Sequence, residues 1–212
     1  TGLVLRGLRK EPATIGKWHL GWDLTYKEGK AKTVDNIDFT KRVANGPTDR
    51  GFDYFYGLTS PSGPPHLYMV NDMAEKQPNT RFEESGGGLY KIKGGIGHSD
   101  WSADGMQPHL ADKMLEYLDE NKDSDKPFFL YMALTAPHIP LFPSKEFKGK
   151  SKIGDYGDLV MMIDDIVGRV NRKLKEIGKY DNTIVMFAAD NGCAGYINMD
   201  RINRKGHYPS YI

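Results

Sequence analysis

Cysteine is almost absent from this sequence of 212 residues, in which Cys193 is the only one. A single cysteine excludes a disulfide bond within the chain. Long apolar runs are also absent: none approaches the ~20 residues of a membrane-spanning helix, so we expect no membrane span. Neither charge dominates, because 29 Lys and Arg residues face 28 Asp and Glu residues and leave a net charge of +1. This balance argues against nucleic-acid binding, which usually needs a concentrated basic face.

The second half of the chain has the pattern of an α/β fold. Leucine and methionine recur at helical spacing over about 108–121, and the apolar run 128–134 suits a strand buried on both faces. A long helix is predicted from Leu159 to Ile177, with Gly178 where a C-terminal cap is expected. The run 183–189 predicts a second buried strand. Alternating helices and strands at this spacing indicate a mostly parallel sheet covered by helices.

The first half is less regular and rich in turn residues. The stretch 22–107 is weakly periodic, and such long stretches usually carry functional loops rather than core. Within it, residues 51–57 (GFDYFYG) form an aromatic cluster between glycines. We expect this cluster to pack a loop onto the sheet, and stacking on a sugar or aryl group is the alternative.

The segment 16–21 (GKWHLG) is the most informative one in the chain. In an extended conformation Lys17 and His19 would share one face, while Trp18 and Leu20 would share the other. A lysine beside a histidine can hold negative charge and move a proton near neutral pH, which suits binding of a tetrahedral oxyanion. The alternative is a surface lysine and a half-buried histidine anchored by the packed indole.

A second histidine follows the predicted strand 128–134. In open parallel sheets, ligands bind beyond the carboxyl ends of the strands. His138 lies in this position, between Pro137 and Pro140, which stiffen the loop. A stiff loop suits a positioned general acid, and a histidine that merely bonds a backbone carbonyl is the alternative.

Two oxygen-bearing side chains, Asp190 and Asn191, follow the predicted strand 183–189. Asp-Asn-Gly is an ordinary turn sequence, but a carboxylate beside a carboxamide also suits a hard cation such as Ca²⁺ or Mg²⁺. Since calcium takes ~6–8 oxygen ligands, most ligands of such a site would lie elsewhere. Cys193 lacks a cationic setting that would activate a thiol, and we expect it to be a small loop residue.

Three of these motifs, residues 16–21, 136–140 (APHIP) and 189–192 (ADNG), occur in an order that resembles the type I sulfatases. These are the formylglycine-dependent arylsulfatases of the alkaline-phosphatase-like superfamily. Residues 51–57 and 154–158 (GDYGD) resemble further segments of the same family. The resemblance implies an alkaline-phosphatase-like α/β/α sandwich with a mostly parallel central sheet. It also implies that residues 1–212 form the central part of a catalytic domain that is incomplete at both ends.

The resemblance also implies a role for each matching residue. Lys17 would contact the sulfate and the nucleophile, His19 would hydrogen-bond a formylglycine hydrate, and His138 would contact the ester and assist the leaving group. Asp190 and Asn191 would be two ligands of Ca²⁺, with Mg²⁺ as the alternative ion. The implied activity is the hydrolysis of an aryl or carbohydrate sulfate monoester.

The chain departs from the family pattern in two respects. The Cys-x-Pro-Ser-Arg segment that becomes formylglycine is absent, and so is the adjacent aspartate pair of the first strand. The resemblance therefore implies a formylglycine outside this chain, made by a formylglycine-generating or anaerobic sulfatase-maturing enzyme. The expected substrate is a sulfated small molecule or glycan, and the expected location is periplasmic, secreted or lysosomal. A phospho- or phosphonate-monoester hydrolase and a non-catalytic binder of sulfated glycans are the alternatives.

Overall fold

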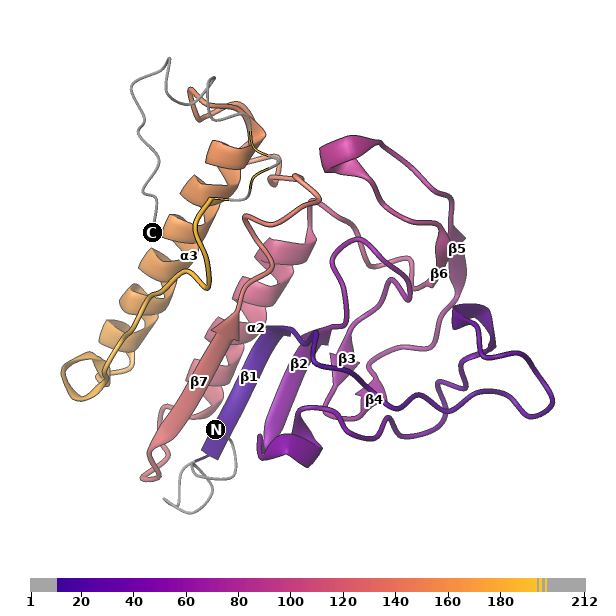
Figure 1. Cartoon of the computed structure of the whole chain (residues 1–212). Coiled ribbons are helices and arrows are strands. Elements are labelled where there is room, and N and C mark those ends of the chain that lie inside the picture. Colours follow the sequence, from indigo (N-terminus) through magenta and orange to yellow (C-terminus); the bar gives the residue numbers. More distant parts are fainter. Residues whose placement is uncertain (1–10, 194, 196, 198–212) are drawn as a thin grey trace.

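A five-stranded sheet forms the centre of the protein. The computed structural model describes residues 11–193, 195 and 197. The strand order is β4-β3-β2-β1-β7 (Figure 1), in which β1 is parallel to both β2 and β7, while β3 and β4 pair in antiparallel fashion. The strands are β1 (Glu11–Lys17), β2 (Tyr54–Leu58), β3 (Met69–Val70), β4 (Met73–Ala74) and β7 (Phe128–Ala133). The parallel pairing on both sides of β1 confirms the expected α/β class.

Shorter elements surround this sheet. A separate two-stranded hairpin consists of β5 (Thr80–Phe82) and β6 (Gly95–Gly97). Single 3₁₀ turns are η1 (Val34–Asn36), η2 (Thr48–Arg50), η3 (Gly88–Tyr90) and η4 (Tyr180–Asn182). All but the last of these elements lie in the stretch that we expected to be loops, so this stretch is more structured than its weak periodicity indicated.

Two long helices cover one face of the sheet. They are α2 (Met106–Glu120) and α3 (Asp155–Glu176), and both match the predicted helices. Their apolar faces share one core with Ile15 of β1 and Tyr56 of β2. In Figure 1, α2 lies behind the sheet. Gly178 has a left-handed φ of 69°, the conformation that commonly ends a helix. Neither described helix combines the length and apolarity that crossing a bilayer requires.

The opposite face of the sheet is covered mainly by irregular chain between Trp18 and Phe52. Here Trp18, Phe39 and Phe52 pack with Phe55 of β2 in a second apolar cluster. The aromatic segment 51–57 is therefore not a loop packed onto the sheet but supplies most of a strand within it. Its adjacent aromatic residues serve both cores, because Phe55 and Tyr56 point to opposite faces and are 0% and 1% exposed.

The structure contradicts two of the strand predictions. Strand β7 is only half-buried, and Tyr131 is 53% exposed, because among the described residues no strand pairs with its outer edge. The run 183–189 forms no strand, and its Ile184 and Phe187 are 86% and 70% exposed. An apolar run with β-branched residues favours a buried strand. The strand forms only where a neighbouring strand supplies the hydrogen bonds.

The loop that leads into α3 is organised around one buried carboxylate. Asp158 is 0% exposed and accepts hydrogen bonds from the backbone N–H groups of Gly149 (2.7 Å) and Ser151 (2.5 Å). It also lies in the first turn of α3, where negative charge is favoured by the helix dipole. One side chain thus fixes both the loop and the helix start.

We expect Asp158→Ala to lower the free energy of unfolding by about 2–3 kcal/mol, because two backbone donors lose a charged acceptor. Asp158→Asn should cost less, since the carboxamide oxygen still accepts one of the two bonds. Chemical denaturation of the complete protein measures both values. Equal stability of Asp158→Ala and the unsubstituted protein would show that the loop does not depend on this carboxylate.

Candidate active site

Lys17 lies at the carboxyl end of β1, where β1 and β7 approach each other closely. Gly16 precedes it with a φ of +133°, and a Cβ atom at this position would lie 1.9 Å from the carbonyl oxygen of Ala133. Only glycine fits between the two strands here. The close approach brings the half-buried Lys17 beside the chain that leaves β7 toward His138.

The predicted alternation of side chains after Lys17 is only partly correct. Trp18 is buried, and its backbone N–H still donates to the carbonyl of Leu58 at 2.9 Å. Leu20, which was expected to share the face of Trp18, is 79% exposed. The chain leaves the sheet after Trp18, so the strand geometry no longer dictates where Leu20 points. His19 is exposed at this departure point.

His138 lies in the loop after β7, at the same end of the sheet. Its Nδ1 is 2.7 Å from the carbonyl oxygen of Ile139, to which it donates as Nδ1–H. In the neutral ring this bond leaves the Nε2 atom without a proton. His138 therefore does bond a backbone carbonyl, which is the alternative that the sequence analysis left open. This bond is compatible with proton transfer at Nε2.

Gln107, which the sequence analysis did not single out, holds the start of this loop. It lies in the first turn of α2 and is 2% exposed. With its carboxamide oxygen turned to the loop, it accepts hydrogen bonds from the backbone N–H groups of Thr135 (3.2 Å) and Ala136 (2.7 Å). Gln107 therefore positions the loop without itself facing a ligand. No local pattern marks it, because its partner segment lies 28 residues away.

Electrostatic interactions connect the candidate residues with one another. Burial lowers the pKa of Lys17, and the negative charge of Asp190 partly opposes this shift. The Lys17 ammonium lowers the pKa of His19, with burial and His138 as the smaller causes. Lys17 is thus influenced by Asp190, and His19 by Lys17 and His138, so three segments far apart in the sequence contribute to one chain of pairwise interactions.

Asp190 and Asn191 are both exposed and contribute oxygen atoms to the same region. The Asn191 amide nitrogen donates to the carbonyl of Gly192 at 2.8 Å, which leaves the amide oxygen as a candidate metal ligand. Within residues 11–193, 195 and 197, no three His, Cys, Asp or Glu side chains gather as a metal-binding group. The two side chains fit a calcium ion in donor type and supply only part of its coordination shell.

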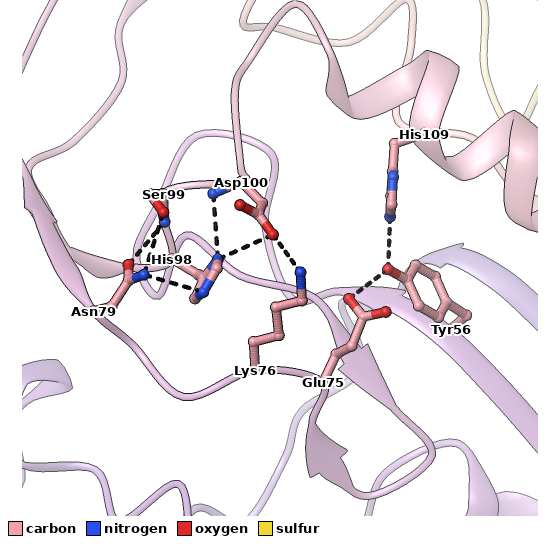
Figure 2. A network of polar contacts seen from close by, with 8 residues as sticks. All are labelled: Tyr56, Glu75, Lys76, Asn79, His98, Ser99, Asp100 and His109. Carbon is pink, nitrogen blue, oxygen red and sulfur yellow. Dashed lines mark hydrogen bonds and ion pairs between the residues drawn. The ribbon is translucent and has the colours of Figure 1, made fainter.

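A second group of polar side chains, shown in Figure 2, was also missed by the sequence analysis. The Tyr56 hydroxyl lies 2.7 Å from Glu75 and 2.6 Å from Nε2 of His109. Because the hydroxyl has one proton, which the carboxylate accepts, the His109 ring donates to the tyrosine oxygen. Burial lowers the pKa of His109, so its ring is neutral at neutral pH. These bonds tie α2 to the sheet and the segment after β4.

The rest of this group forms a neighbouring set of contacts. His98 interacts with Asn79 and Asp100, and Asp100 forms an ion pair with Lys76. With His109, several of these side chains line a cavity of about 330 Å³. The lining includes two histidines, two carboxylates and two lysines, and one of these lysines, Lys113, forms its ion pair with Glu116 outside the cavity lining.

The sequence of the chain matches a known protein family. A family model described as Sulfatase matches residues 5–208, nearly the whole chain. The chain belongs to the sulfatase family. It is 31% identical over 195 residues to the N-acetylgalactosamine-6-sulfatase of Sus scrofa, a match that covers 90% of this chain and 32% of the relative. It is 27% identical to the N-acetylgalactosamine-6-O-sulfatase of Bacteroides thetaiotaomicron, covering 93% of this chain and 44% of that protein. The chain thus spans a third to a half of the curated relatives it matches.

Solved sulfatase structures share the fold. One, from work on the metabolism of multiple glycosaminoglycans by Bacteroides thetaiotaomicron, has a TM-score of 0.73 at 23% identity and covers 95% of this chain and 48% of that chain. Another, the PsFucS1 sulfatase from Pseudoalteromonas sp., has a TM-score of 0.58 at 23% identity over 86% of this chain and 35% of that chain. These neighbours confirm the alkaline-phosphatase-like α/β architecture of the sulfatase family.

Proposed function

We propose that this chain forms part of the active site of an enzyme that hydrolyses sulfate monoesters. The observation that carries the proposal is the parallel pairing of β1, which ends at Lys17, with β7, which leads to His138, together with the electrostatic influence of Asp190 on Lys17 and of Lys17 and His138 on His19. This edge is where parallel α/β sheets bind ligands. Membership of the sulfatase family supports the same activity.

Each side chain has a distinct task in the proposed reaction. The Lys17 ammonium binds the sulfuryl oxygens and stabilises the negative charge that develops on them. The acid is the imidazolium form of His138, which has a proton on each ring nitrogen. It donates the Nε2 proton to the leaving oxygen, while its Nδ1–H bond to the Ile139 carbonyl keeps the ring oriented. His19 is neutral at neutral pH and hydrogen-bonds the attacking group.

Two groups that the family resemblance implies complete the proposal. Asp190 and Asn191 would hold a calcium ion together with ligands from outside the described residues. Such an ion supplies positive charge beside the sulfuryl oxygens. A formylglycine outside this chain, produced by a maturing enzyme, would serve as the nucleophile. Sulfated glycans are the favoured substrates because two matched relatives are named for a sulfated sugar. The family resemblance supports a periplasmic, secreted or lysosomal location.

The activity is tested with the complete protein produced in a host that makes formylglycine. We expect sulfate release from 4-nitrophenyl sulfate with a kcat/KM well above that for 4-nitrophenyl phosphate. Greater turnover of the phosphate would favour the phospho-monoester hydrolase instead. Binding of a sulfated oligosaccharide without sulfate release would favour a non-catalytic binder. Mass spectrometry of the nucleophile peptide checks the formylglycine separately.

A further inference from the structure

A second cavity lies close to His138 along the chain and has no part in the site described above. It has a volume of about 510 Å³, and its walls come from residues 82–92, 101–104 and 142–148. Phe142 lies four residues after His138, so their Cα atoms can be at most about 14 Å apart. This separation is within the length of a short oligosaccharide.

The cavity has an apolar floor and charged walls of opposite sign. Phe82 and Phe142, both half-buried, supply apolar surface, while Ile92 and Trp101 are each only 5% exposed and contribute little of it. Phe142 is held in place because Tyr90 packs edge-on against its ring, with ring centroids 5.9 Å apart. Apolar faces of this kind suit the C–H face of a sugar ring.

The charges are separated by segment. Lys145 and Lys148 line the side formed by the loop after Phe142, whereas Glu83 and Asp104 line the side formed by the other two segments. Ammonium groups bind sulfate or carboxylate groups, and carboxylates accept hydrogen bonds from hydroxyl groups. The cavity therefore matches a sugar that has hydroxyl groups on one side and a single anionic substituent on the other.

The loop that carries the two lysines has a defined conformation. Backbone N–H groups of Phe147 and Lys148 donate to the carbonyl of Ser144 at 2.9 Å and 3.0 Å. The buried Asp158 holds the next residues through Gly149 and Ser151. The lysine backbones are thus positioned before a ligand binds, which lowers the entropic cost of binding.

We propose that this cavity binds a second, anionic sugar residue of a glycan whose sulfate ester lies at His138. The inference rests on the proposed function, because it assigns the neighbouring part of the same substrate. Lys145 and Lys148 would bind the sulfate or carboxylate of this second residue, with the ring on the apolar floor. The lysines contribute to binding of the extended substrate and not to the reaction at the ester.

The test uses Lys145→Gln/Lys148→Gln in the complete protein, with a chondroitin 6-sulfate hexasaccharide and 4-nitrophenyl sulfate as probes. We expect KM for the hexasaccharide to rise about tenfold, the equivalent of ~1.4 kcal/mol, with kcat unchanged. Hydrolysis of 4-nitrophenyl sulfate should be unaffected, because this ester does not reach the cavity. Lys122→Gln/Lys126→Gln is the matched control, since it removes the same charge at the amino end of β7.

Direct binding separates this inference from the proposed function. Fluorescence anisotropy with labelled hexasaccharide should show about tenfold weaker binding by the cavity variant and a weaker dependence on salt concentration. If the unsubstituted protein releases no sulfate, the proposed function fails, while the anisotropy still decides the cavity. Unchanged hexasaccharide binding would overturn the inference. Equal losses on the hexasaccharide and on 4-nitrophenyl sulfate would also overturn it.

Discussion

Lys17→Met is expected to lower kcat on 4-nitrophenyl sulfate about 100-fold or more, the typical effect of removing one preorganised donor from a developing oxyanion. The ammonium is half-buried, and its attraction to a sulfuryl group is therefore stronger than in water. Methionine keeps the length and apolar stem of the side chain, so the substitution removes the charge with little change in packing.

The stability of this variant distinguishes a catalytic loss from misfolding. Burial disfavours the charged form of Lys17, which its lowered pKa reflects, so the neutral methionine should leave the unfolding temperature unchanged or higher. Lys32→Met serves as the control, because Lys32 is exposed in the irregular chain after β1. Near-normal turnover by Lys17→Met would remove this residue from the proposed site.

His138→Ala is expected to lower kcat on an aryl sulfate tenfold or more, up to the ~10⁴-fold that general acid catalysis can contribute. The loss should be larger for a sugar sulfate than for 4-nitrophenyl sulfate, because an alkoxide needs a proton to leave and a nitrophenolate does not. Steady-state kinetics with both esters measures this difference.

His138→Asn tests the same role with a smaller structural change. Its amide nitrogen can still donate to the carbonyl of Ile139, but it cannot transfer a proton, so we expect the same leaving-group dependence. His98→Asn is the control, because His98 belongs to the separate polar group of Figure 2. A uniform loss with both esters would contradict proton donation by His138.

Local sequence patterns were sufficient to predict the two long helices and the position of strand β7. The apolar repeats that predict α2 and α3 depend only on side-chain spacing within each helix, and both helices formed at nearly the predicted residues. The run that became β7 was equally clear, but its predicted burial was not observed. Burial of a strand depends on its neighbours, which one segment does not specify.

Other features could not be found from single segments. Strand β2 alternates aromatic residues between two cores, and without knowledge of both cores its sequence resembled a packed loop. Gln107 positions the His138 loop through backbone groups 28 residues away, and a backbone partner leaves no mark in the sequence. The cavity beside Lys145 and Lys148 depends on three separate segments in the same way.

The sequence by itself determined the composition of the proposed site: a lysine and two histidines, with an Asp-Asn pair, in segments that resemble the sulfatases. Only the tertiary structure decided that Lys17 lies beside the chain that leads to His138, because the parallel strands β1 and β7 bring their carboxyl ends to one edge whatever their separation along the chain. It likewise brought Asp190, which follows no strand, near enough to influence Lys17. It also decided that 183–189 lies exposed, since an apolar run becomes a strand only beside a partner that offers hydrogen bonds.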